Sequence, residues 1–262
     1  MEETRIAVAC GDIFCAYAGP DARGPALLLL HGWTLDHRMW RPQFAALSKS
    51  CLVLCPDRRG FGRSTAPAAI EHETEDAARV LDHFGVRQAI IVGMSQAGRV
   101  ALEFALQLPE RTQGLVLQGA RAGAQETVPE IPLDEFAALV RAGNLDEMKR
   151  RWSAHTLMQT RSADAAVTVS EMLRSYDGRD LLQPPSGLPE LTSAALATIS
   201  APALIIAGAE ETPQRARASE WLAQALPNAE RAEIPLAGHL CNFCQSEAYN
   251  EILARFITRT RA

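Results

Sequence analysis

Short runs of apolar residues, each the length of one buried strand, recur along the chain and alternate with stretches of helical periodicity. The runs lie at 26–30, 51–55, 89–92, 114–117 and 203–207. Strands that are apolar throughout are typical of a parallel sheet covered on both faces, and parallel strands need crossover connections, which are usually helices. The sequence therefore predicts an α/β fold with a mostly parallel central sheet flanked by helices.

The alternation stops between about residues 121 and 199. This segment carries apolar stripes at helical spacing but no clear buried strand, and a Pro- and Gly-rich linker at 183–189 lies near its end. We therefore expect a helical cap or lid at 121–199, inserted into a core that is formed by 1–120 and 200–262.

Composition limits the possible partners. The chain has 262 residues, 47% of them hydrophobic, and a net charge of −5 that is spread along its length. It has no basic block of the kind that binds nucleic acid and no apolar run long enough to cross a membrane. The segment 1–6 contains two acids and precedes no apolar run, so we expect no secretory signal and a cytoplasmic location. The oligomeric state stays open.

The cysteine spacing gives a weak signal for a metal. Six cysteines are present, and Cys241 and Cys244 have the Cys-x-x-Cys spacing of metal and redox pairs. A four-ligand zinc site needs a second such pair, and disulfides are rare in the cytoplasm. We expect structural thiols, no bound metal and no cofactor.

The segment 93–98, Gly-Met-Ser-Gln-Ala-Gly, joins the apolar run at 89–92 to a helical stripe. A serine at a tight strand-to-helix turn projects its hydroxyl from a strained backbone, and small neighbours let the helix pack close to the strand. Ser95 is thus a candidate nucleophile, and the amide of Gln96 is a candidate oxyanion donor at the helix N-terminus. The structural alternative is that Ser95 is an ordinary helix N-cap.

A base and an acid for this serine are also present. His239 lies in a loop before the last helical stripe, where it could take the proton from Ser95 and return it to the leaving group. The acid that orients a catalytic histidine often follows a strand, and Glu210 and Glu211 follow the run at 203–207. The residues alone leave open which of the two glutamates serves.

The loop after the first apolar run reads His31-Gly32-Trp33. Gly32 allows the backbone to approach a ligand closely, and the amide of Trp33 is a candidate second oxyanion donor, facing that of Gln96. We interpret His31 as a residue that hydrogen-bonds the loop backbone, not as a second base.

Four segments together resemble the α/β-hydrolase superfamily, close to its 3-oxoadipate enol-lactonase and carboxylesterase-like members. The oxyanion strand and loop, the Asp-x-Arg-Gly-x-Gly-x-Ser turn, the nucleophile elbow and the histidine loop correspond to residues 27–33, 56–64, 93–98 and 237–239. The resemblance implies the α/β-hydrolase fold and a serine nucleophile. It also places the acid three positions after Gly208, which favours Glu211 over Glu210, although the family usually carries Asp there.

The resemblance implies a serine esterase or lactonase that acts on a small molecule through an acyl-enzyme. Alternatives are a cofactor-free dioxygenase, or another non-hydrolytic enzyme of this fold, and a hydrolase-like ligand-binding receptor. The dioxygenases look for an acid where Gln118 stands and a histidine where Leu35 stands, so we disfavour that interpretation. We expect the cap to cover Ser95 with a mostly apolar wall formed by Phe136, Leu139, Trp152, Met158 and Met172.

Overall fold

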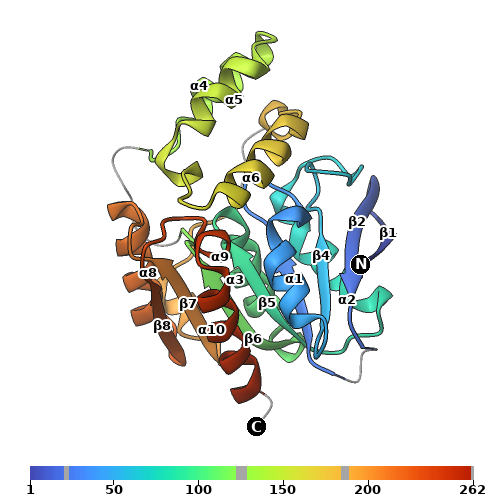
Figure 1. The fold of residues 1–262 in the computed structure, drawn as a ribbon. Helices are drawn as coiled ribbons and strands as arrows, with labels where there is room; N and C mark the ends of the chain where they lie inside the picture. The colour runs from blue at the N-terminus through green and yellow to red at the C-terminus, as the bar shows by residue number, and fades with distance from the viewer. Residues whose placement is uncertain (21–23, 122–128, 184–188, 261–262) are drawn as a thin grey trace.

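The computed structural model describes residues 1–20, 24–121, 129–183 and 189–260 (Figure 1). Eight strands form one sheet in the order β1-β2-β4-β3-β5-β6-β7-β8. β1 and β2 form an antiparallel hairpin at one edge, β2 runs antiparallel to β4, and the other neighbouring pairs are parallel. The strands are β1 (Glu2–Val8), β2 (Gly11–Ala18), β3 (Ala26–Leu30), β4 (Leu52–Pro56), β5 (Ala89–Met94), β6 (Thr112–Gln118), β7 (Ala203–Gly208) and β8 (Ala229–Ile234).

Helices cover both faces of this sheet, which confirms the predicted fold class. Successive residues of a strand point to opposite faces, and accordingly Leu27 and Leu29 belong to one hydrophobic cluster and Leu28 and Leu30 to the other. The first cluster includes side chains from α1 (Arg41–Leu47), α9 (Cys241–Cys244) and α10 (Ser246–Arg259). The second includes side chains from α2 (Glu73–His83), α3 (Gln96–Gln107) and α8 (Pro213–Ala225).

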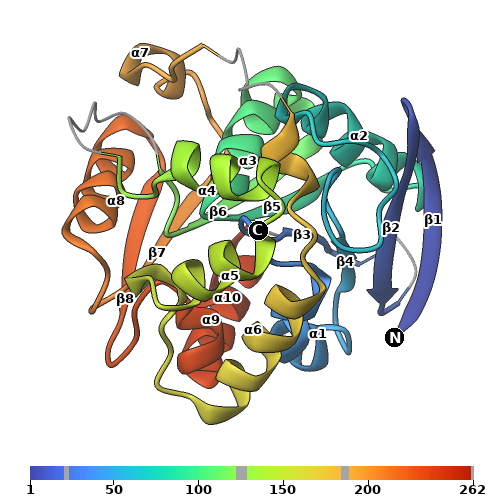
Figure 2. The same cartoon turned by 90° about the horizontal axis from the view of Figure 1, so that it is seen from above.

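The connection between β6 and β7 carries helices and, in its described part, no strand. Its α-helices are α4 (Leu133–Arg141), α5 (Leu145–Ser153), α6 (Ala163–Ser175) and α7 (Ser193–Leu196). Figures 1 and 2 show α4, α5 and α6 on one end of the molecule, above the central strands. α7 instead lies against α3 and α8 of the core. The end that carries α4–α6 is also where β5 passes into α3.

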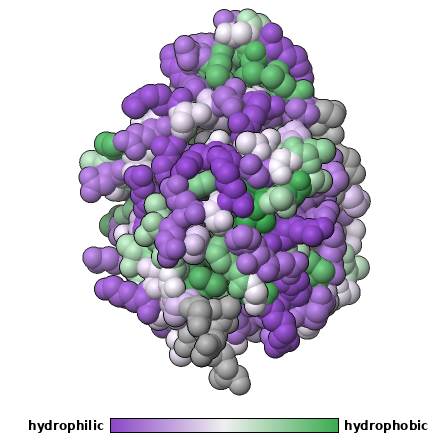
Figure 3. Space-filling view, turned by 90° about the vertical axis from the view of Figure 1, so that its right-hand side faces the viewer, coloured by the Kyte–Doolittle hydropathy of each residue, from purple (hydrophilic) through white to green (hydrophobic). Residues whose placement is uncertain are grey.

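The surface is mainly hydrophilic in the view of Figure 3, with hydrophobic residues at the end formed by α4 and α5 and in smaller patches over the rest of this face. Among the described helices, none has the length and apolar character that a membrane span requires.

Candidate active site

Ser95 lies at the junction between β5 and α3 with φ +56° and ψ −115°, a conformation that non-glycine residues rarely adopt. Its N–H donates to the Gln118 carbonyl at 2.8 Å, and its own carbonyl accepts from Gly98 N–H at 3.0 Å. A Cβ at Gly93 would lie 2.8 Å from that of Ala101, so the helix packs against the strand only because residue 93 is glycine. The Ser95 side chain makes no capping hydrogen bond to α3, which argues against the N-cap alternative.

His239 lies in the loop after β8, and its Nδ1 is 2.8 Å from Glu211 Oε1. Both side chains are almost fully buried, with exposed fractions of 4% and 2%. A carboxylate that accepts a hydrogen bond from Nδ1 favours the tautomer with its proton on Nδ1. In that tautomer Nε2 carries no proton and can accept one. The structure therefore pairs the predicted histidine with the glutamate that the family register favours.

Glu210, the other candidate acid, faces a different partner. Its carboxylate pairs with Arg161 of the cap in two hydrogen bonds of 2.7 and 2.9 Å, in a largely exposed position. Hydrogen bonding to the Arg161 guanidinium lowers the pKa of Glu210. The two adjacent glutamates thus point apart, one to His239 and one to the cap surface.

The space for the Glu211–His239 pair comes from Gly119, which sequence reasoning missed. Gly119 follows β6 with φ +52°, and a Cβ there would lie 2.6 Å from His239 Nδ1 and 2.8 Å from Glu211 Oε1. Any side chain at residue 119 would displace the pair. The sequence signal that could have found it is a glycine directly after a buried strand.

Gln118 binds both the nucleophile turn and the histidine loop. Its carbonyl accepts from Ser95 N–H, while its side-chain Nε2 donates to the His239 carbonyl at 3.1 Å and to Asn242 Oδ1 at 2.9 Å. Asn242 in turn donates to the Met39 carbonyl and to Gln43. This buried amide network fixes the backbone of the His239 loop relative to Ser95.

The oxyanion loop is oriented by His31, as the sequence interpretation held. His31 Nδ1 donates to the Gly32 carbonyl at 2.8 Å, and its Nε2 accepts from Arg58 N–H at 2.8 Å. Carbonyl and N–H of a trans peptide point in opposite directions, so the Trp33 N–H points away from the His31 ring. A Cβ at Gly32 would lie 3.5 Å from Ser95 Cβ, which shows how closely this loop approaches Ser95.

His31 is kept neutral by its surroundings. Burial, and then the positive charge of Arg58, lower the pKa of His31 to about 4. Arg58 itself binds Glu73 through two hydrogen bonds of 2.5 and 2.8 Å and donates to Gln96 Oε1 at 3.0 Å. Sequence reasoning placed Arg58 in a family motif but did not find its contacts with Glu73 and Gln96.

A cavity of about 480 Å³ is lined by Trp33 and Gln96, the two residues that carry the candidate oxyanion donors, but its lining does not include Ser95, Glu211 or His239. Trp33, Arg58 and Gln96 line it from the core, and Leu133, Ala137, Arg141, Asp180 and Leu181 line it from the cap. The five cap side chains expected to form an apolar wall do not line this cavity. Phe136, Trp152, Met158 and Met172 are buried in a hydrophobic cluster with Trp33, and Leu139 packs against that cluster.

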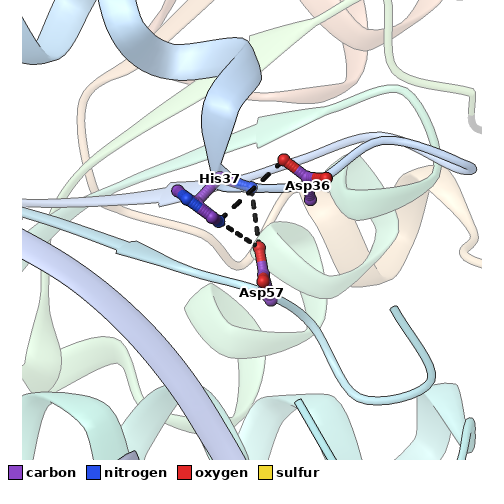
Figure 4. Close-up of side chains that lie close together, drawn as sticks. All are labelled: Asp36, His37 and Asp57. Atoms are coloured by element: carbon purple, nitrogen blue, oxygen red, sulfur yellow. Dashed lines mark hydrogen bonds and ion pairs between the residues drawn. The ribbon is translucent and has the colours of Figure 1, made fainter. Parts of the chain in front are cut away.

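Asp36, His37 and Asp57 form a second group of titratable side chains, and all three are buried (Figure 4). Asp57 Oδ1 accepts from the backbone N–H of His37 at 2.8 Å and from its Nδ1 at 2.7 Å, while Oδ2 accepts from Arg63 N–H at 2.8 Å. The nearby Asp36 carboxylate pairs with the Arg38 guanidinium. Asp36, His37 and Asp57 are close enough to hold a metal ion, but their hydrogen bonds explain the cluster as support for the turn at 56–64.

The cysteines are free thiols in this structure, and neither Cys241 nor Cys244 belongs to a metal-sized cluster of the described residues. Cys241 is fully buried, and burial followed by the charge of Glu211 raises its pKa well above the ordinary value. Cys244 Sγ lies 3.0 Å from Thr160 Oγ1 of the cap connection.

Comparison with known proteins identifies the family. The alpha/beta hydrolase fold family matches residues 25–243, so the chain belongs to that family. A putative carbamate hydrolase RutD of Azorhizobium caulinodans is 28% identical over 89% of this chain and 91% of its own length. The 3-oxoadipate enol-lactonase 2 of Acinetobacter baylyi is 26% identical over 90% of this chain and 89% of its own length.

The fold comparison agrees with the sequence comparison. A thermophilic esterase from Thermogutta terrifontis superposes with a TM-score of 0.83 at 23% identity, and the match covers 100% of both chains. The expected fold and the family resemblance are therefore confirmed, and hydrolases are among the relatives of this chain.

Proposed function

We propose that this chain is a serine hydrolase that cleaves small carboxylic esters or lactones. Ser95 is the nucleophile, His239 the general base and Glu211 the acid that orients it. The backbone amides of Trp33 and Gln96 form the oxyanion hole. The observation that carries the proposal is the buried Glu211–His239 pair. Gln118 hydrogen-bonds both the backbone of the His239 loop and the N–H of Ser95 in its strained turn.

The reaction proceeds in two steps, acylation of Ser95 and hydrolysis of the acyl-enzyme. In acylation, His239 Nε2 takes the Ser95 proton as Oγ adds to the ester carbonyl, and the carbonyl oxygen becomes an oxyanion held by the two amides. Collapse of this intermediate expels the alcohol, which receives the proton from His239. In deacylation, His239 activates water in the same way, the acid product leaves, and Ser95 regains its proton.

The cavity supports a compact substrate. Its volume of about 480 Å³ lies in the range of small-molecule pockets, and it adjoins both residues proposed as oxyanion donors. Relatives named as carbamate hydrolase and enol-lactonase share this fold, so the acyl–heteroatom bond that is cleaved has to be determined by a substrate panel.

The proposal is tested by intact mass after reaction with a fluorophosphonate, followed by rates on short p-nitrophenyl esters, lactones and a phenyl carbamate. We expect one adduct on the native chain and none on Ser95→Ala, with a loss of ester turnover of about a thousandfold or more. Ser50→Ala, at an exposed turn, is the matched control and should keep native rates. Near-native turnover by Ser95→Ala would contradict the mechanism, and a carbamate rate far above all ester rates would correct the substrate class.

A further inference from the structure

Two tryptophans connect the cap to the oxyanion loop by hydrogen bonds that run in opposite directions. The indole Nε1 of Trp33, in the loop, donates to Asp180 Oδ2 of the cap at 2.7 Å. The indole Nε1 of Trp152, in α5 of the cap, donates to Thr34 Oγ1 of the loop at 2.7 Å. The bond between Trp152 and Thr34 is buried and does not compete with bulk water, whereas the bond between Trp33 and Asp180 is partly buried, because Asp180 lines the cavity.

Thr34 transmits the cap contact to the backbone of Trp33. Its hydroxyl accepts from Trp152 and donates to the Trp33 carbonyl at 2.7 Å. Thr34 has φ +62°, a strained conformation for a β-branched residue that persists only where surrounding contacts hold it. The bond from Trp152 is one such contact.

Asp180 is itself held inside the cap. Its other oxygen, Oδ1, accepts from the Tyr176 hydroxyl at 2.6 Å. The Trp33 ring is enclosed by cap side chains, with ring centroids 4.8 Å from Trp152 and 6.2 Å from Phe136. The cap therefore fixes the side chain of Trp33 through Asp180 and its carbonyl through Trp152 and Thr34.

We infer that Asp180 and Trp152 are positioning residues for the oxyanion hole, so that the cap is a component of the catalytic site as well as its cover. His31 orients the peptide that precedes Trp33, and the two cap residues fix the side chain and the carbonyl of Trp33 itself. Together these contacts aim the Trp33 amide at the oxyanion. The inference rests on the proposed function, because it assigns a role to the amide that the proposed mechanism uses.

The first test replaces one indole N–H at a time. Trp152→Phe removes the donor to Thr34 while keeping an aromatic ring. Trp40→Phe is the matched control, because Trp40 is equally buried but its Nε1 has no hydrogen-bond partner among the described residues. We expect Trp152→Phe to lower kcat for a short ester about tenfold at nearly constant KM, since misaligning one oxyanion donor costs part of the 10²–10³ associated with its removal. Trp40→Phe should stay within about twofold of native.

The second test uses Asp180→Leu, with Tyr176→Phe as its control. Leucine has a similar branched shape but no hydrogen-bond acceptor, so the donors of both Trp33 and Tyr176 lose their partner. Tyr176→Phe removes the Tyr176 donor alone and leaves the Trp33 bond in place. We expect a kcat loss of about tenfold for Asp180→Leu and a change within about twofold for Tyr176→Phe.

The decisive readout is inhibition by a trifluoromethyl ketone relative to the matching methyl ketone. The fluorinated ketone adds to Ser95, and its carbonyl oxygen becomes an oxyanion in the hole, whereas the methyl ketone binds without addition. Trp152→Phe and Asp180→Leu should weaken binding of the fluorinated ketone only, by about tenfold. The inference would be overturned if a variant lost affinity for both ketones equally. It would also be overturned if the ratio of the two inhibition constants in the variants matched the ratio in the two controls. Failure of the native chain to react with the fluorophosphonate would instead overturn the proposed function, and the inference with it.

Discussion

Glu211 Oε1 lies 2.8 Å from His239 Nδ1, although Glu210, its neighbour in the chain, pairs with Arg161 on the surface. The loop after β7 thus gives two chemically identical side chains different environments. One is buried against an imidazole, and the other is exposed beside a guanidinium. A shift of one residue along the loop therefore decides which glutamate contacts His239, the proposed general base.

This relationship predicts different effects for two matched substitutions. Glu211→Gln replaces the carboxylate that holds the His239 tautomer and stabilises the imidazolium, so we expect kcat to fall by about a hundredfold or more. Glu210→Gln removes only an exposed ion pair, and its rate should stay within about threefold of native. Steady-state kinetics on a short ester measure both. Equal, mild losses would show that the acid lies elsewhere.

Gly119 gives a second prediction, with a control supplied by the same chain. Gly119→Ala should lower both kcat and the melting temperature, because the new Cβ would lie 2.6 Å from His239 Nδ1. Gly143→Ala has comparable backbone strain, with φ +76°, but no atom within 4 Å of the new Cβ. Gly143→Ala should lower the melting temperature modestly, because alanine is strained at this positive φ, and should leave kcat unchanged. Identical kinetics for the two variants would contradict the assigned role of Gly119.

The sequence predicted the buried strands of the core well, for a physical reason. Buried parallel strands are continuous apolar runs, and the run at 26–30 coincides with β3. α8 begins at Pro213, where Thr212 caps it and proline is favoured in the first turn. Local patterns of this kind leave clear signals in a sequence.

Contacts between distant segments leave no such signal. Trp33 and Asp180 are 147 residues apart, and Trp152 and Thr34 are 118 apart. No periodicity or motif indicates that these residues meet. The choice between Glu210 and Glu211 likewise came from family register, since both side chains follow the same strand. The cap was expected from the break in alternation, but its contacts with the loop were found only in three dimensions.

His31 predicts a specific pH dependence of stability. The fold lowers its pKa from 6.5 to about 4, so the folded state favours the neutral ring. The unfolded chain binds the proton first as the pH falls, and the stability contributed by His31 is complete above about pH 6.5 and is lost towards pH 4. The free energy of unfolding that His31 contributes falls by about 3 kcal/mol over this pH range. Unfolding by urea between pH 7 and 4 should show a shallower decline for His31→Asn than for the native chain.

His72→Asn is the matched control for this experiment because His72 is exposed. Its unfolding free energy should follow the native pH profile. A His31→Asn profile parallel to the native one over the same range would show that the His31 ring is not held neutral by its contacts with Gly32 and Arg58.

The length of the acyl group provides the last prediction. The cavity beside Trp33 and Gln96 has a volume of about 480 Å³, and Leu133, Ala137 and Leu181 line it from the cap. The cap is attached to the loop at 31–35 by two indole hydrogen bonds, so moving the cap away to admit a longer acyl chain would break both. We expect kcat/KM for p-nitrophenyl esters to fall steeply beyond about eight acyl carbons, because each methylene that does not fit costs on the order of 1–3 kcal/mol. A series from acetate to palmitate measures this directly. Equal rates on a long-chain triglyceride and a short ester would refute this limit on acyl length while leaving the Ser95 mechanism intact.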